Sequence, residues 1–311
     1  MSADACPPWD SARSPVVPHL DRLLGAVRYV APERAAALQP TLDRVTWCVD
    51  DAPGFVFRAR GGADPRTIRA SVVGLEFLWA LSYAHPAIYN AGKDDGAADL
   101  DFATRPDTAA AAALLGVAFG DRLGPAPPRC ALPAHLPRPH FHEPGAGTPG
   151  LVELATELWA YATGWILHHE LSHVRLGHLD TAAATARDEQ RDEQDADAAA
   201  TAWMLEGVTD PALAHKRGLG VALAVLALGS LALANRPTPA QLARYPTAGE
   251  RILRALCDSA LGEDGPVHEF ACVALKVHFD HRGLALSRGP FDTAYDCLHA
   301  YCRALSRFER G

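Results

Sequence analysis

The sequence predicts an α+β fold in which helices predominate. Apolar residues recur at helical spacing through several long segments, above all in the second half of the chain. Only residues 43–49 and 54–60, both early in the chain, have the β-branched and aromatic content of short strands. With 311 residues and 49% hydrophobic composition, the chain is long and apolar enough for a well-packed core.

Turn and proline positions divide the predicted elements. The two strands flank a short turn and predict a β-hairpin, and residues 66–83 predict a buried helix that ends before Pro86. A Pro-rich stretch then separates the two halves of the chain. We therefore expect an N-terminal α+β region, a Pro-rich linker or lid, and a helical region, packed as one compact unit: residues 1–123, 124–150 and 151–311.

One long helix is predicted between Gly150 and a C-terminal cap at Gly177. It contains His-Glu-x-x-His. His169 and His173 are four residues apart, so a helix places both imidazoles on one face, where they can share one zinc ion. Glu170 lies beside them, where a general base could take a proton from a metal-bound water.

A second helix, about twenty residues further on, supplies candidate carboxylates. Glu193 would complete a ligand set of two histidines and one carboxylate, and Asp197, one turn later, could orient a ligating imidazole. A solvated acidic helix face is the alternative, and Glu189 is the rival ligand one turn earlier. His168 points away from the metal face and is predicted to be structural. His178 is predicted to be a helix-end histidine, and a position near the site is the alternative.

The His-Glu-x-x-His segment followed by Glu193-Gln194-Asp195-Ala196-Asp197 resembles the gluzincin metallopeptidases. On the scale of the whole chain, the length and the mid-chain position of the motif are most similar to the Lit-type phage-exclusion peptidases. This resemblance implies a zincin-like core, a Zn²⁺ cofactor and an intracellular endopeptidase that acts during phage infection. It also implies elongation factor Tu as the type of protein substrate.

Residues 245–252 resemble the His-Pro-x-x-x-x-Arg segment that follows the Glu ligand in several such families, with Tyr245 at the usual His position. The resemblance makes Tyr245 and Arg251 candidate catalytic residues that stabilise an oxyanion in the cleft. The alternative is an ordinary turn followed by the start of a helix.

Charge and cysteine usage narrow the function classes. A net charge of −8 and a pI near 5.9 argue against nucleic acid as a partner. Seven scattered cysteines without Cys-x-x-Cys, and an N-terminus without a signal-peptide pattern, favour a cytoplasmic protein. The uncharged run at residues 218–234 is at the lower limit of a membrane span, and we expect a buried helix; inner-membrane association remains the alternative.

The residues therefore predict a zinc-dependent endopeptidase that hydrolyses an intracellular protein or peptide. Two alternatives stay open. In one, the zinc only joins two helices of a binding or regulatory protein. In the other, the metal serves a hydrolase that acts on bonds other than peptide bonds.

Overall fold

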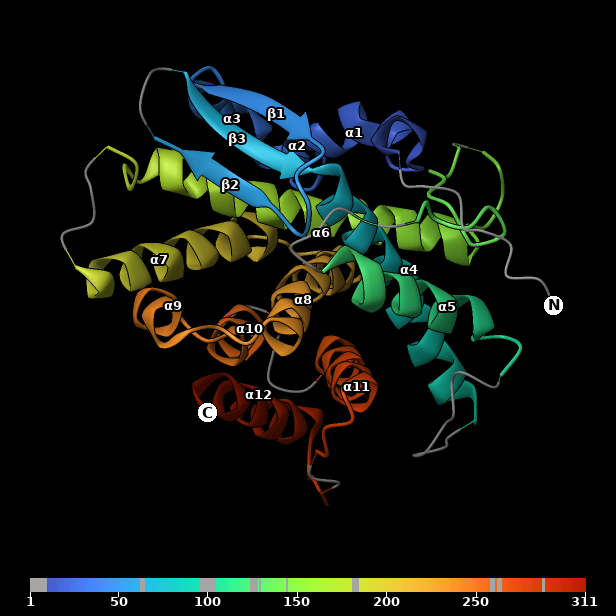
Figure 1. Cartoon of the computed structure of the whole chain (residues 1–311). Helices are drawn as coiled ribbons and strands as arrows, with labels where there is room; N and C mark the ends of the chain where they lie inside the picture. The colour runs from blue at the N-terminus through green and yellow to red at the C-terminus, as the bar shows by residue number, and fades with distance from the viewer. Residues whose placement is uncertain are drawn as a thin grey trace.

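The computed structural model describes residues 10–61, 65–95, 105–123, 128, 130–143, 145–180, 185–257, 261, 265–286 and 289–311. It is predominantly helical with one small sheet, as the sequence predicts (Figure 1). The strands are β1 (Val45–Asp50), β2 (Phe57–Arg60) and β3 (Arg66–Ser71). The helices are α1 (Leu20–Leu24), α2 (Ala26–Tyr29), α3 (Ala35–Leu42), α4 (Val72–Asp95), α5 (Ala109–Val117), α6 (Leu151–Arg175), α7 (Ala186–Leu205), α8 (Pro211–Ala234), α9 (Pro239–Arg244), α10 (Ala248–Cys257), α11 (Pro266–His281) and α12 (Ala294–Arg310).

The sheet corrects the predicted hairpin. β1 and β2 do not pair with each other; β3 lies between them in the order β1-β3-β2, parallel to β1 and antiparallel to β2. Ser71 at the end of β3 explains the arrangement, because its hydroxyl donates to Gly54 O and accepts from Val56 N. These bonds hold the β1–β2 connection against β3. β2 is therefore an edge strand of the sheet.

The helix predicted over residues 66–83 is wrong at both ends. Its first six residues form β3, and α4 continues past Pro86 to Asp95. A proline inside a helix removes one backbone hydrogen bond. Here Ala84, Ala87 and Ile88 around it are all buried, so packing on both sides holds the helix together across the proline.

Helix α6 runs through the centre of the molecule. In Figure 1 the sheet lies on one side of α6, and α8 to α12 lie on the other. α6 packs against α4, α7 and α8, and a hypothetical Cβ on Gly220 of α8 would lie only 2.4 Å from Tyr161 Cβ of α6. Trp159 and Trp165 of α6 are buried, and their indole N–H groups donate to Leu75 O and Thr201 Oγ1, respectively. α6 is therefore fixed on several sides.

The apolar run at residues 218–234 forms most of α8. Among the described residues, α8 is the one helix long and apolar enough to cross a membrane, and 78% of its most apolar window is buried inside the fold. It packs on α6, α10 and α11. The expected burial of this run against a metal-ligand helix is thus observed.

The Pro-rich stretch at residues 124–150 lies in part outside the described residues. Its described part buries Leu132 and Leu136, and Pro137 O accepts a hydrogen bond from Trp79 of α4. His140 N donates to Thr156 near the start of α6. These contacts lie near the end of α6 opposite to the predicted metal ligands.

Candidate metal centre

Two helix ends bring the predicted ligands together. α6 carries His169 and His173 in its last two turns and ends before Gly177, whose positive φ of 77° is easily adopted only by glycine. α7 begins after Thr185, whose hydroxyl accepts the N–H of Asp188 as an N-cap, and it carries Glu193 two turns in. The packing of α7 against α6 places Glu193 across from the two imidazoles.

The three predicted ligands have the spacing that a tetrahedral ion requires. His169 Nε2 and His173 Nε2 are 3.2 Å apart, and Glu193 oxygens lie 3.5 Å from His169 Nε2 and 3.6 Å from His173 Nε2. Ligand atoms about 2.0–2.2 Å from a tetrahedral zinc are roughly 3.3–3.6 Å from one another. Among the described residues, this is the one group of three or more His, Cys, Asp or Glu side chains with ligand atoms this close.

The electrostatics of the group are those of a cation site. Burial opposes charge on His169, but the carboxylates of Asp197 and Glu193 outweigh it and raise the pKa of His169 to about 10. Burial and the nearby His169 lower the pKa of His173 to about 4. Burial works against ionisation of Glu193 too, yet contact with His169 lowers its pKa to about 2. The site therefore holds a positive charge between its carboxylates, where a metal ion would take the place of the proton.

Asp197 and Arg251 form a chain of contacts that begins at the His169 ring, on the side away from the other ligands. Asp197 Oδ1 lies 2.8 Å from His169 Nδ1, the nitrogen that faces away from the other ligands. Arg251 of α10 donates Nε to Asp197 Oδ2 at 2.7 Å and Nη2 to Oδ1 at 2.6 Å, and its Nη1 lies 3.7 Å from Glu193. Asp197 is buried, but the charge of Arg251 overcomes that burial and lowers its pKa to about 2. The Asp197 carboxylate thus lies between the guanidinium of Arg251 and the ring of His169.

Glu170 is buried between α6 and the edge strand. Its carboxylate accepts a hydrogen bond from Ala59 N of β2. Burial raises the pKa of Glu170. The nearby His169 and the hydrogen bond from the Ala59 amide lower it, but the effect of burial is larger. A carboxyl group with a raised pKa beside the ligand set has the properties of a proton acceptor and donor.

A cavity of ≈ 720 Å³ opens over these groups. The three ligands, Glu170 and Arg251 line it, together with Phe57 and Ala59 of β2 and Leu228 and Leu231 of α8. Tyr245 also lines it and is 40% exposed. The cavity thus joins the predicted metal ligands, both predicted catalytic candidates of the 245–252 segment and the edge of the sheet.

The rival ligand stays at the rim of this cavity. Glu189 forms an ion pair with Arg244 and, although it lines the cavity, does not belong to the close ligand group. His168 is structural as predicted, since its Nε2 lies 2.9 Å from Val27 O and its ring stacks on Trp203.

His178 is predicted to be a helix-end histidine, but in the structure it contacts the ligand candidate His173. His178 Nδ1 lies 3.1 Å from His173 Nδ1, and His178 Nε2 lies 3.7 Å from Asp192. The turn at Gly177 reverses the chain and brings the His178 ring next to His173. Asp197 is placed in the same way next to His169. The backbone of Ala59 is the second contact that the sequence did not indicate. The His-x-x-x-Gly-His spacing was the available signal for His178.

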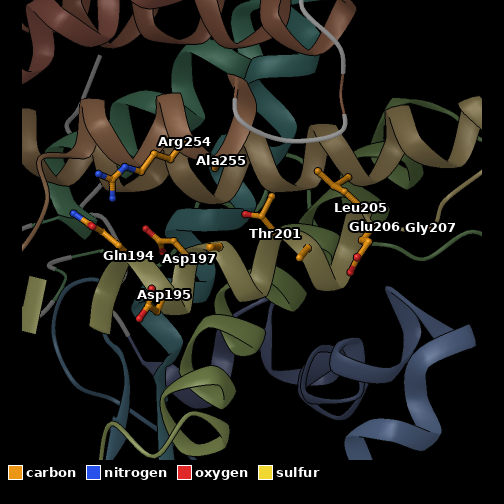
Figure 2. A pocket seen from close by; sticks show the side chains of 11 residues that line it. Gln194, Asp195, Asp197, Thr201, Leu205, Glu206, Gly207, Arg254 and Ala255 are labelled. Atoms are coloured by element: carbon orange, nitrogen blue, oxygen red, sulfur yellow. The ribbon is translucent and has the colours of Figure 1, made fainter. Parts of the chain in front are cut away.

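A second cavity of ≈ 600 Å³ lies between α7 and α10 on a different face of α7 (Figure 2). Asp197 is the one predicted site residue in its wall, and Arg254 projects over it from α10 (Figure 2). The remaining wall combines small and apolar residues, such as Ala198, Ala202 and Leu205, with polar ones such as Gln194 and Thr201. The ligand set faces the first cavity and not this one.

Comparison with known proteins identifies the family. The family model described as Peptidase U49 matches residues 68–271, which is more than half of the chain and includes every predicted site residue. The chain belongs to the peptidase U49 family. Its substrates are accordingly proteins or peptides.

A curated relative agrees with this assignment. The chain is 29% identical over 268 residues, 79% of this chain and 86% of the relative, to a protein named cell death peptidase from Escherichia coli (strain K12). No solved structure shows a significant match. The resemblance to Lit-type peptidases predicted from the sequence is confirmed by the family and the relative.

Proposed function

We propose that this member of the peptidase U49 family is a zinc-dependent endopeptidase. The observation that carries the proposal is the buried group of His169, His173 and Glu193, whose ligand atoms have the mutual spacing of a tetrahedral zinc site. Two histidines and one carboxylate are the ligand set of a catalytic zinc with an open fourth position. When bound, the ion supplies a Lewis acid and lowers the pKa of a coordinated water.

The chain's own residues supply the proton transfers and the orientation. Glu170 takes a proton as general base and returns it to the leaving amine, and the bond from Ala59 N holds its carboxylate in the cavity. Asp197 fixes the tautomer and the ring orientation of His169, and His178 is placed to do the same for His173.

The roles of the two candidates in the 245–252 segment differ. The guanidinium of Arg251 is engaged by Asp197 through two hydrogen bonds, so we assign it a positioning role instead of the expected role at the oxyanion. Tyr245 is partly exposed and lines the cavity, which leaves it as the candidate donor to the developing oxyanion.

The edge of β2 offers a place for an extended peptide. β2 pairs with β3 on one side, and its other side faces the cavity through Ala59. A peptide strand that added to this edge would pass over Glu170 and the ligand set. Cleavage inside a chain, not at its ends, is expected from such an arrangement.

A peptide-library digest tests this function. The purified protein is incubated with the library alone, with a chelator, and with the chelator followed by excess zinc. We expect cleavage that the chelator abolishes and zinc restores, and that is lost in Glu170→Gln. Cleavage that persists with the chelator would refute the zinc mechanism. Retained zinc without any cleavage would leave the ion as a structural link only.

The biological setting is proposed on the resemblance and on the chain's chemistry. We propose a role in phage defence on the resemblance to the Lit-type peptidases. We propose a cytoplasmic location because the cysteines form no disulfide among the described residues and the apolar run of α8 is largely inside the fold. Plating of phage on cells that carry the wild type or Glu170→Gln tests the defence role. Recovery in a detergent-extracted membrane fraction would instead favour inner-membrane association through residues 218–234.

A further inference from the structure

The cavity over the predicted metal ligands borders a smaller side pocket. This side pocket, of ≈ 280 Å³, lies between the C-terminal half of α8, the α9–α10 segment and the last turn of α12. It shares four lining residues with the cavity over the ligands: Leu228, Leu231, Gln241 and Arg251. The two spaces therefore meet at these side chains, within reach of a molecule that lies over the ligands.

Apolar side chains form much of the side pocket. Leu228 and Leu231 are three residues apart and share one face of α8. Both are only half-buried, although most of this helix lies inside the fold. Ala232 lies next to them, and Pro237 and Pro246 line the pocket from the connections before and after α9. An apolar group that covered these half-open leucines would remove apolar surface from water, which is favourable.

The polar side chains of the side pocket are already engaged by the fold. Each of the four has a hydrogen-bond partner: Arg251 with Asp197, Glu309 with Ala248 N, Gln241 with Thr238 N and Asn235 with Leu123 O. Arg251 and Glu309 also carry opposite charges, so a charged ligand of either sign would meet a like charge in the wall. The side pocket therefore favours an uncharged, apolar group.

We propose that the side pocket is a specificity subsite that receives one apolar side chain of the peptide substrate, next to the bond that is cleaved. This inference rests on the proposed peptidase function. The cavity over the ligands is lined by Phe57 and Ala59 of β2 and by Leu228 and Leu231 of α8, and β2 and α8 lie on opposite sides of α6 (Figure 1). A peptide that lies over the ligands is therefore flanked by β2 and by α8.

The conformation of such a peptide limits the subsite to one residue. Successive side chains of an extended chain point to opposite faces. One residue beside the cleaved bond can thus place its side chain against Leu228 and Leu231 while its two neighbours point away from them. A volume of ≈ 280 Å³ admits a side chain as large as leucine or phenylalanine.

Cleavage-site profiling of the zinc-loaded, full-length protein tests the subsite. The protein is incubated with a peptide library, and the new termini are identified by mass spectrometry. We expect leucine, methionine or phenylalanine to be enriched at one fixed position beside the cleaved bond. Replacement of that residue by alanine in a single peptide substrate should lower kcat/KM roughly 10-fold or more, because even one methylene group in an apolar pocket has an effect of about that size.

Two substitutions in the side pocket should change the preference in opposite directions. Ala232→Leu occupies part of the pocket, so the preference should move to alanine and glycine, and peptides with these small residues should still be cleaved. Leu231→Ala enlarges the pocket, so tryptophan and other large side chains should gain. Ala212→Leu is the control, because it makes the same change at an exposed position in the first turn of α8, and it should keep the wild-type profile.

The outcomes distinguish this subsite from the proposed function. Absence of all cleavage by the wild type would overturn the peptidase function and the subsite with it. Cleavage without an apolar preference, or with a preference for lysine or arginine at that position, would overturn the subsite alone. An apolar preference that stays the same in both Ala232→Leu and Leu231→Ala would also overturn it, because the preference would then arise elsewhere in the cavity.

Discussion

Glu170 is a buried carboxyl group outside the close ligand group, and it accepts a hydrogen bond from the amide of Ala59. Glu170→Gln keeps the size and a polar group in that place but removes the base. We expect zinc content near that of the wild type, and peptide hydrolysis reduced by ~10²–10⁴, the usual contribution of a general base. Metal analysis and a peptide-cleavage assay on the same preparation measure both quantities.

Two neighbouring glutamates are the controls for this substitution. Glu193→Ala removes a ligand, so metal and activity should be lost together. Glu189→Ala breaks only the ion pair with Arg244 at the rim and should retain zinc. The reverse pattern, with zinc lost from Glu189→Ala and kept by Glu193→Ala, would show that the ligand lies one helical turn earlier.

Arg251 and Arg254 are a matched pair on α10. Arg251 donates two hydrogen bonds to Asp197, whereas Arg254 is exposed and projects over the second cavity (Figure 2). Arg251→Lys keeps the charge but cannot reproduce the two-pronged contact, so we expect a loss of ~10–100-fold in zinc affinity or activity. Competition with a chromophoric chelator measures the affinity. Arg254→Lys should leave it unchanged, and equal losses in both variants would argue against orientation through Asp197.

At the residue level, spacing alone predicted the contacts within one helix, whereas contacts between helices were predicted only where a family pattern pointed to them, as for Glu193 and Asp197. Two histidines four residues apart must share a helical face, so His169 and His173 follow from the motif alone. The contact between Arg251 and Asp197 joins two residues that are 54 positions apart, on α10 and α7, and the sequence offered only a family pattern for it. That pattern suggested an oxyanion donor, because spacing does not show which buried carboxylate an arginine will meet.

At the level of elements, long helices were predictable and strand partners were not. α6 extends over almost the whole predicted range because its apolar spacing and its terminal glycines agree. β3 was not predicted, because Arg66 and Arg69 stand directly before an apolar run of helical spacing and resemble the start of that helix. Its strand conformation comes from pairing with β1 and β2, which is a tertiary effect.

A buried histidine pair couples α4 to α11. His85 Nε2 and His278 Nε2 are 2.8 Å apart, and Ser230 Oγ of α8 lies 3.0 Å from His278 Nδ1. Burial lowers the pKa of His85 to about 3; burial, His85 and His281 lower that of His278. Both folded-state values lie below the unfolded value of about 6.5, so the unfolded chain binds more protons between these values. Their contribution to stability is complete above about pH 6.5 and is lost as the pH falls.

Denaturant unfolding of the metal-free protein between pH 7.5 and 4.5 measures this loss. Each histidine that titrates only on unfolding adds about 1.4 kcal/mol per pH unit to the slope of the unfolding free energy. His85→Asn should reduce the slope by up to that amount, and His135→Asn, at an exposed position, serves as the control. An unchanged slope in His85→Asn would mean that His85 is not held neutral in the fold.

On the scale of the whole molecule, a single apolar cluster joins residues of the predicted N-terminal and C-terminal regions. Phe77 of α4, Trp159 of α6, Leu223 of α8 and Phe270 of α11 all belong to it. The helix that sequence alone could not distinguish from a membrane span is part of this cluster. Length and composition are the same for a core helix and a membrane helix, and the fold adds that 78% of the most apolar part of α8 is buried.

In the proposed function, a zinc ion held by His169, His173 and Glu193 would join α6 to α7, so its removal should lower the stability of the whole fold. A ligand present at about 100 times its dissociation constant stabilises a protein by about 2.7 kcal/mol. For a chain of this size, that corresponds to a fall in Tm of roughly 5 °C after chelation. Differential scanning calorimetry with and without chelator measures the shift.

Two variants connect this shift to the proposed site. His173→Ala lacks a ligand, so its Tm should not respond to the chelator, whereas Glu170→Gln should keep the full shift while it lacks hydrolysis. A shift of equal size in His173→Ala would place the stabilising ion elsewhere. A wild-type protein with zinc bound but no shift would mean that the ion does not hold α6 and α7 together. In the proposed mechanism Glu170 transfers the proton and His173 is a ligand, so the two variants separate binding of the ion from catalysis.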